Sequence, residues 1–303
     1  MADTIARGSG QHEDLPDFAL DLLAELRASH YHPVGWVRFL GRSWRQSRAT
    51  AQAHPRLVAS WLRITAVLVV AEALALASEA ARGHRAASRQ AVSVAAGLLA
   101  LQQLDAYVHL GMNNRQRESA PRDDLGLPNA LTLARQSTAG LLWAHLLVRR
   151  PVSRGYLAAA LLAASVTDVA DGALARRLDR TSRLGQYLDG EADLSFALAV
   201  ALTLGLRRDV PRWLVFLVLA RWSVPFIYGL ASYFGWISRV PISSTIVGKA
   251  AGVAQALTMG AALAPERSLP SLAPVRRALH LLTAGLLVAA PLTQWRKVRR
   301  MRV

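Results

Sequence analysis

The stretch TDVADGALARRLDRTSRLGQYLDGEAD, residues 167–193, decides how this chain folds. It holds two pairs of carboxylates: Asp168 with Asp171 three residues later, and Asp189 with Asp193 four residues later. Residues three or four apart share one face of a helix. Apolar segments enter and leave the stretch, and carboxylates at the end of a membrane helix are costly unless a cation neutralises them. The stretch therefore predicts a cation-binding site within a membrane protein.

The composition of the chain agrees with a membrane location. Its 303 residues are 52% hydrophobic and only 18% charged, whereas a soluble domain is about a quarter charged. The net charge of +16 resides mostly on arginines beside apolar runs, which favours attraction to anionic lipid headgroups over binding of nucleic acid. The chain has no cysteine, so disulfides and cysteine-based metal sites are excluded. The N-terminal stretch is polar, and we expect no cleaved signal peptide there.

Six apolar segments follow one another in the C-terminal part of the chain. Each is about 20 residues long, roughly the length that crosses a bilayer core of about 30 Å. Short polar joints separate them, so consecutive segments should run antiparallel. The predicted fold is therefore an all-α integral membrane bundle of six transmembrane helices. The segments are 130–148, 155–176, 185–206, 211–231, 244–263 and 275–293.

A helical extension precedes this bundle. Residues 17–48 carry leucines and tryptophans among arginines, which is typical of an amphipathic helix at the lipid headgroups. Apolar stretches at 64–78 and 91–112 form either two extra spans or a helical hairpin packed on the bundle. The predicted division is 1–55 as a polar and amphipathic region, 56–113 as a hydrophobic helical pair, 114–128 as a linker, 129–295 as the bundle and 296–303 as a basic tail.

The predicted orientation rests on the tail RKVRRMRV, residues 296–303, whose five basic residues favour the cytoplasm. The loops give no preference, because the two sides carry similar numbers of Lys and Arg. An even number of spans separates the tail from the 176–184 loop. That loop, and the aspartates beside it, should therefore face the cytoplasm as well.

Within residues 167–193, the two helical faces that carry the aspartates can turn toward each other. Four carboxylates would then converge on one pocket at the membrane surface, and hard oxygen ligands in that number suit Mg²⁺ or Mn²⁺, with two ions expected. Small residues beside them leave room for a substrate, and Arg176 offers a guanidinium fork to a phosphate oxygen. The faces are Asp168, Asp171, Gly172 and Ala175 on the second segment, and Gly185, Asp189 and Asp193 on the third.

Carboxylates, a divalent metal and an arginine around small residues are the groups that transfer a phosphoryl group. The plainer interpretation is that the aspartates pair with nearby arginines at a solvated helix end. Four aspartates at two facing helical spacings, with glycines on the same faces, disfavour that interpretation.

At these residues the chain resembles the CDP-alcohol phosphatidyltransferase family, whose signature is D-x-x-D-G-x-x-A-R, eight residues, then G-x-x-x-D-x-x-x-D. The resemblance implies a six-helix membrane bundle of phospholipid biosynthesis, in which an acceptor hydroxyl attacks the β-phosphate of a CDP-linked alcohol and releases CMP. It implies a CDP-linked donor, either a CDP-linked lipid such as CDP-diacylglycerol or a soluble CDP-alcohol, a small polar alcohol as acceptor, and a homodimer in many members. The matching positions are Asp168, Asp171, Gly172, Ala175, Arg176, Gly185, Asp189 and Asp193.

The resemblance also implies roles for these residues. The four aspartates would be ligands of Mg²⁺ or Mn²⁺, and Asp193 would be a ligand, the general base on the acceptor hydroxyl, or both. The CDP moiety would be held by Asp171, Gly172, Ala175, Arg176 and Gly185.

Two flanking stretches, LPNALTLAR (127–135) and GKAAGVAQ (248–255), resemble more weakly the phosphatidylglycerophosphate synthases of that family. The second has Ala251 and Gly252 where lysine and threonine are expected, so the acceptor alcohol stays open. Cations in or beside the apolar spans would bind a phosphate on the acceptor, snorkel to the interface or pair with an aspartate. The candidate acceptor residues are Asn129, Thr132, Arg135, Arg221 and Lys249.

Two other functions compete with this prediction. An intramembrane prenyltransferase also uses aspartate motifs and Mg²⁺, but such enzymes carry their two motifs on distant helices, and here both pairs fall within residues 168–193. A non-catalytic metal-binding membrane protein or transporter would explain the carboxylates, but not the small residues beside them.

Overall fold

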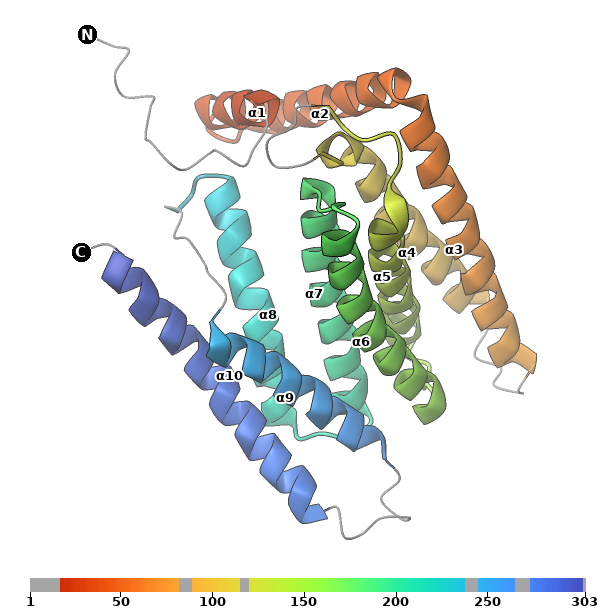
Figure 1. The fold of residues 1–303 in the computed structure, drawn as a ribbon, viewed down its shortest axis with the longest axis vertical. Helices are drawn as coiled ribbons and strands as arrows, with labels where there is room; N and C mark the ends of the chain where they lie inside the picture. Colours follow the sequence, from red (N-terminus) through yellow and green to blue (C-terminus); the bar gives the residue numbers. More distant parts are fainter. Residues whose placement is uncertain (1–16, 82–88, 115–119, 238–244, 265–272, 302–303) are drawn as a thin grey trace.

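The computed structural model describes residues 17–81, 89–114, 120–237, 245–264 and 273–301, and every regular element in these ranges is a helix. Most helices form one bundle, and the two helices of residues 17–53 lie across one end of it (Figure 1). The predicted all-α membrane class is thereby confirmed. The helices are α1 (Asp17–Ala28), α2 (Pro33–Ala53), α3 (Pro55–Ala81), α4 (Arg89–Val108), the 3₁₀ turn η1 (Leu110–Met112), α5 (Gly126–Leu147), α6 (Arg154–Arg177), α7 (Arg183–Leu206), α8 (Arg212–Tyr233), α9 (Ile246–Leu263) and α10 (Ala273–Met301).

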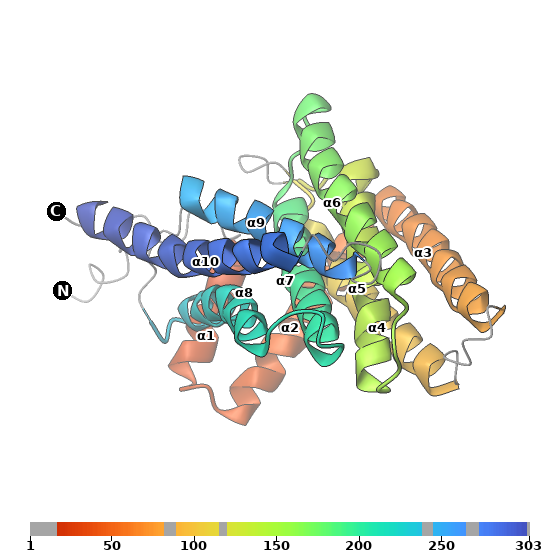
Figure 2. The same ribbon diagram turned by 90° about the horizontal axis from the view of Figure 1, so that it is seen from below.

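Helices α5 and α7 pack against each other at the centre of the bundle. Helices α3, α4 and α6 lie on one side of this pair, and α8, α9 and α10 lie on the other (Figures 1 and 2). The main apolar core runs between the two sides and includes Leu142, Leu157, Val200 and Leu204, each fully buried. The central pair is therefore surrounded by other helices for much of its length.

Six of the described helices are long and apolar enough to cross a membrane: α3, α4, α6, α8, α9 and residues 273–294 of α10. By length and composition, α3 and α4 are thus candidate spans beside the predicted bundle. Helices α5 and α7, which we predicted as apolar spans, are not among the six. Their polar residues lower their hydropathy, since α5 buries a series of polar side chains and α7 carries three carboxylates. Neighbouring helices can satisfy such groups where lipid cannot.

Buried polar contacts attach α3 and α4 to the central pair. The Ser137 hydroxyl on α5 donates to a Glu72 carboxylate oxygen on α3 at 2.6 Å. The Gln102 side chain on α4 donates to the Gln136 carbonyl at 2.9 Å. Polar groups within apolar surroundings are costly unless they are paired, so these contacts fix where the helices sit. The hydrophobic pair predicted at 56–113 is an integral layer of the fold.

The predicted amphipathic segment 17–48 folds as two helices, because the chain turns between α1 and α2. His30 and Tyr31 have positive φ angles of 49° and 58° at this turn. Tyr31 Oη and Arg27 Nε both donate to the carbonyl of Phe234, directly after α8. Ser47 Oγ donates to the Val108 carbonyl at the end of α4, at 2.9 Å. Helices α1 and α2 therefore connect the end of α8 with the end of α4, and they project beyond α8 in the end-on view (Figure 2).

Side-chain caps mark several helix starts in the bundle. The hydroxyls of Ser153, Ser182 and Thr245 accept hydrogen bonds from backbone N–H groups in the first turns of α6, α7 and α9. Two predicted boundaries differ from the structure. Helix α5 begins at Gly126, inside the predicted linker, and α10 continues to Met301, so the basic tail prolongs a helix as far as that residue.

Candidate active site

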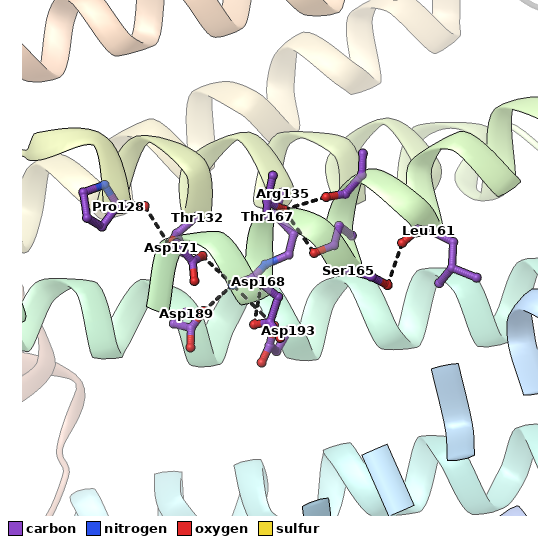
Figure 3. Close-up of polar contacts among 12 residues, drawn as sticks. Pro128, Thr132, Arg135, Leu161, Ser165, Thr167, Asp168, Asp171, Asp189 and Asp193 are labelled. Atoms are coloured by element: carbon purple, nitrogen blue, oxygen red, sulfur yellow. Dashed lines mark hydrogen bonds and ion pairs between the residues drawn. The ribbon is translucent and has the colours of Figure 1, made fainter. Parts of the chain in front are cut away.

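Side chains from three helices meet at the candidate site, because α5 lies against both α6 and α7. Asp168 and Asp171 come from α6, and Asp189 and Asp193 come from α7 (Figure 3). The turn between α6 and α7 is five residues, 178–182, and the Ser182 cap starts α7 directly after it. The two predicted faces therefore meet, as the spacing of the aspartates indicated.

The carboxylates form a compact group of oxygens. One oxygen each from Asp168, Asp189 and Asp193 lies within 4.8 Å of the others, a spacing that could hold a metal ion. Asp171 differs from these three, because its side chain is 8% exposed and it accepts a hydrogen bond from the buried Thr132 hydroxyl at 3.2 Å. The Asp168 side chain is 53% exposed, so the group opens to the surface on the α6 side.

The guanidinium of Arg135 on α5 lies among all four aspartates (Figure 3). Its terminal nitrogens are 2.7 Å from Asp168, 3.4 Å from Asp171 and 3.5 Å from Asp193, and they also donate to Asp189. Pairing with an aspartate was one of the alternatives for this cation. Binding an acceptor phosphate, the other functional role considered, stays a prediction.

The donor set fits a divalent metal. Four carboxylates face a single guanidinium, so the site carries excess negative charge that Mg²⁺ or Mn²⁺ would neutralise. The ligands are oxygens, which these ions prefer, and they come from rigid helices instead of loops. Asp168, Asp189 and Asp193 are the residues that would hold such an ion, with Asp171 beside them.

The small residues of the motif lie next to polar side chains. A Cβ atom on Gly185 would stand 2.7 Å from Asn129 Oδ1, so only glycine allows α7 to approach α5 this closely. A Cβ atom on Gly172 would stand 3.3 Å from a terminal nitrogen of Arg176. Arg176 is exposed and Ala175 is half-buried, so this side of α6 presents a cation and a small surface to the outside.

The candidate acceptor residues are divided among several places. Asn129 and Thr132 line the inner face of α5, where both are buried. Arg221 on α8 donates to the Gly248 carbonyl at 3.1 Å, which brings it to the start of α9 beside the exposed Lys249. Ala251 is fully buried in the core, so no long cation could replace it without disturbing the packing.

A polar network on the far side of α7 lies outside the aspartate motif and was not predicted from the sequence. The Tyr187 hydroxyl contacts Asp105 at 3.1 Å and Glu191 at 2.6 Å, so this contact joins α4 to the helix that carries Asp189 and Asp193. The ring of His109 packs on Tyr187, with centroids 4.4 Å apart. Burial alone would lower the pKa of His109, but the hydrogen bond and charge of Asp105 outweigh burial and raise it. The signal in the sequence was the spacing of Tyr187 and Glu191, which lie four residues apart on either side of Asp189.

Comparison of the sequence with known proteins identifies its family. The sequence profile of the CDP-alcohol phosphatidyltransferase family matches residues 125–293, from the start of α5 into α10. The chain belongs to this family. The match covers α6 and α7 with all four aspartates, and it removes the prenyltransferase alternative.

Individual relatives match shorter parts of the chain. The cardiolipin synthase (CMP-forming) of Streptomyces coelicolor is 38% identical over 102 residues, which is 32% of this chain and 46% of that protein. A putative cardiolipin synthase of Mycobacterium tuberculosis is 35% identical over 104 residues, 33% of this chain and 46% of that protein. The CDP-diacylglycerol–glycerol-3-phosphate 3-phosphatidyltransferase of Rickettsia bellii is 30% identical over 122 residues, 40% of this chain and 66% of that protein.

The chain thus spans about half the length of the first of these relatives. No solved structure matches it. The N-terminal layer formed by α1 to α4 lies outside the region that the family profile covers.

Proposed function

We propose that this protein transfers a phosphatidyl group from CDP-diacylglycerol to an acceptor alcohol, with release of CMP, in a reaction that depends on Mg²⁺ or Mn²⁺. The observation that carries the proposal is the group of oxygens from Asp168, Asp189 and Asp193 within 4.8 Å of one another. These residues lie in the region that matches the family profile. Bound divalent ions would neutralise the charge that develops on the pyrophosphate as the bond breaks.

The reaction conserves atoms and charge in a simple way. The acceptor oxygen forms a bond to the β-phosphorus of the donor, and the bond from that phosphorus to the bridging oxygen breaks. CMP leaves with the electron pair, and the acceptor hydroxyl loses its proton. Asp193 is the proposed acceptor of that proton, because it faces the same group of oxygens and is only partly exposed.

The donor's nucleotide is proposed to lie along α6 and the start of α7. Gly172, Ala175 and Gly185 present little side-chain volume there, and Arg176 is exposed beside Gly172. A guanidinium at that place can form two parallel hydrogen bonds to a phosphate. We therefore assign Arg176 to a phosphate of the CDP moiety, with Asp171 holding the inner end of the site.

The acceptor is proposed to be a lipid that carries a free glycerol hydroxyl, such as phosphatidylglycerol. The relatives named cardiolipin synthase support this class, as does the buried Ala251 in place of a lysine. Glycerol 3-phosphate carries about two negative charges and phosphatidylglycerol carries one. A site with one lysine fewer should favour the acceptor with less charge. Arg221 and Lys249 are the cations proposed to meet its phosphate.

We also propose that the site faces the cytoplasm. The α6–α7 turn and the C-terminal end of α10 point to the same end of the bundle, and α1 and α2 lie across that end (Figure 1). Basic residues are frequent in α2 and in the last turns of α10, and such clusters favour the cytoplasmic leaflet.

Release of CMP by the purified full-length chain tests the proposal. The assay contains CDP-diacylglycerol and Mn²⁺ in detergent micelles, with phosphatidylglycerol, glycerol 3-phosphate or no acceptor. We expect the fastest release with phosphatidylglycerol, and a loss of about 10²-fold or more in Asp193→Asn, the usual contribution of a general base. Asp123→Asn is the matched control, because Asp123 lies outside the site and is paired only loosely, 3.6 Å from Arg56.

Two results would contradict parts of this proposal. Faster release with glycerol 3-phosphate would overturn the assigned acceptor and leave the chemistry intact. If the protein binds Mn²⁺ but releases no CMP under any of the three conditions, the proposed enzymatic activity is excluded. A non-catalytic metal-binding protein is then favoured.

A further inference from the structure

Arg135 is held at the centre of the aspartate group by the packing around α5. Its side chain is 2% exposed, and it contacts Asp168, Asp171, Asp189 and Asp193 at once. Among the described residues, its Nε atom is buried without a hydrogen-bond partner. The guanidinium therefore leaves one donor unsatisfied while its terminal nitrogens contact the carboxylates, which indicates that attraction to the aspartates determines its position.

A divalent ion would need the same oxygens. Mg²⁺ prefers oxygen ligands, and Asp168 and Asp189 are among the residues that would supply them. The terminal nitrogens of Arg135 already contact both of these carboxylates, at 2.7 Å for Asp168. Two cations cannot occupy that space together, because their volumes overlap and their charges repel at short range.

We propose that Arg135 is a built-in competitor of the divalent metal. Its guanidinium neutralises part of the aspartate charge and joins α5 to the aspartates of α6 and α7. A divalent ion held by these aspartates would take the place of the guanidinium at Asp168 and Asp189. This inference rests on the proposed function for the identity of the ion, and it explains how four carboxylates can be assembled at a membrane helix end before any metal arrives.

Metal binding without turnover tests the proposal. Free Mn²⁺ is measured by its electron paramagnetic resonance signal while it is titrated into the full-length chain in detergent, with no nucleotide present. We expect Arg135→Gln to bind Mn²⁺ about tenfold more tightly or better, because a competing unit charge is removed from contact distance. Arg135→Lys keeps the charge and should bind Mn²⁺ nearly as weakly as the wild type.

Thermal unfolding supplies a second measurement. In EDTA, Arg135→Gln should unfold at a lower temperature than the wild type, since its aspartates repel one another without a counter-cation, and Mn²⁺ should restore it. The matched control is Arg221→Gln, which also removes a cation from a membrane span. In the wild type, Arg221 donates to the Gly248 carbonyl instead of to an aspartate. The affinity of Arg221→Gln for Mn²⁺ should equal that of the wild type.

The outcomes separate this inference from the proposed function. Equal or weaker Mn²⁺ binding by Arg135→Gln overturns the competition, whatever the rate of CMP release. If the wild type binds no Mn²⁺ and Arg135→Gln does, competition is supported. If neither protein binds Mn²⁺, the inference and the metal dependence of the proposed function are both refuted, and CMP release then decides whether transfer itself occurs.

Discussion

The contact between Gly185 and Asn129 sets how closely α7 can approach α5 at the site. In Gly185→Ala the new Cβ atom would stand 2.7 Å from Asn129 Oδ1 and 3.2 Å from Ser182 Oγ. Ordinary contact begins at 3.4 Å, so Asn129 would have to move by about 0.7 Å. Asn129 is 4% exposed and donates to the Leu125 carbonyl at 2.8 Å, so it cannot move without disturbing that bond.

The expected magnitude follows from these contacts. Overpacking costs about 1–3 kcal/mol and a weakened buried hydrogen bond about 0.5–1.5 kcal/mol, while alanine gains about 1 kcal/mol over glycine within a helix. We therefore expect Gly185→Ala to lose about 0.5–3.5 kcal/mol of unfolding free energy. The rate of CMP release should fall by about 10- to 100-fold, because a displacement approaching 1 Å near reacting groups costs that much.

The matched control lies on the same helix. A Cβ atom on Gly190 would meet nothing within 4 Å, so Gly190→Ala should gain up to about 1 kcal/mol and keep the wild-type rate. Unfolding midpoints in detergent and CMP release are measured for both variants. In an Asn129→Ala background the added methyl group should no longer destabilise the protein. If Gly185→Ala matches Gly190→Ala in both measurements, the close approach of α5 and α7 has no role at the site.

Two further predictions concern the N-terminal layer. Ser137→Ala should destabilise the protein by about 1–3 kcal/mol, because it leaves the Glu72 carboxylate buried without its partner. Ser78 on α3 is exposed, so the control Ser78→Ala should change stability by less than about 0.5 kcal/mol. Equal unfolding midpoints of the two variants would show that the contact between Ser137 and Glu72 does not hold α3. Because the chain has no cysteine, single cysteines can report where α2 lies. Val37 is 71% exposed and lies on the same side of α2 as Leu40 and Trp44. A fluorophore attached to Val37→Cys should therefore be quenched by brominated lipid in anionic vesicles. The quenching should be stronger than for a fluorophore on the control Gln46→Cys, which is also exposed. Equal quenching at the two positions would place α2 away from the headgroups.

Helical spacing made the core of the candidate site predictable from the sequence. Residues three and four apart share a helix face whatever the surroundings, so the pairs Asp168–Asp171 and Asp189–Asp193 could be placed before any tertiary contact was known. The short turn between them left few ways to arrange the two faces. The all-α membrane class followed in the same way, from the length of the apolar segments.

The tertiary structure alone decided what surrounds those carboxylates. Arg135 lies more than 30 residues before the first of them, and only the packing of α5 against α6 and α7 brings its guanidinium among all four. The contacts of Glu72 with Ser137 and of Asp105 with Tyr187, which make the N-terminal helices part of the fold, also join distant parts of the chain. Local periodicity fixes the face on which a side chain lies, but its partners depend on how whole helices pack, and that packing minimises the free energy of the entire bundle.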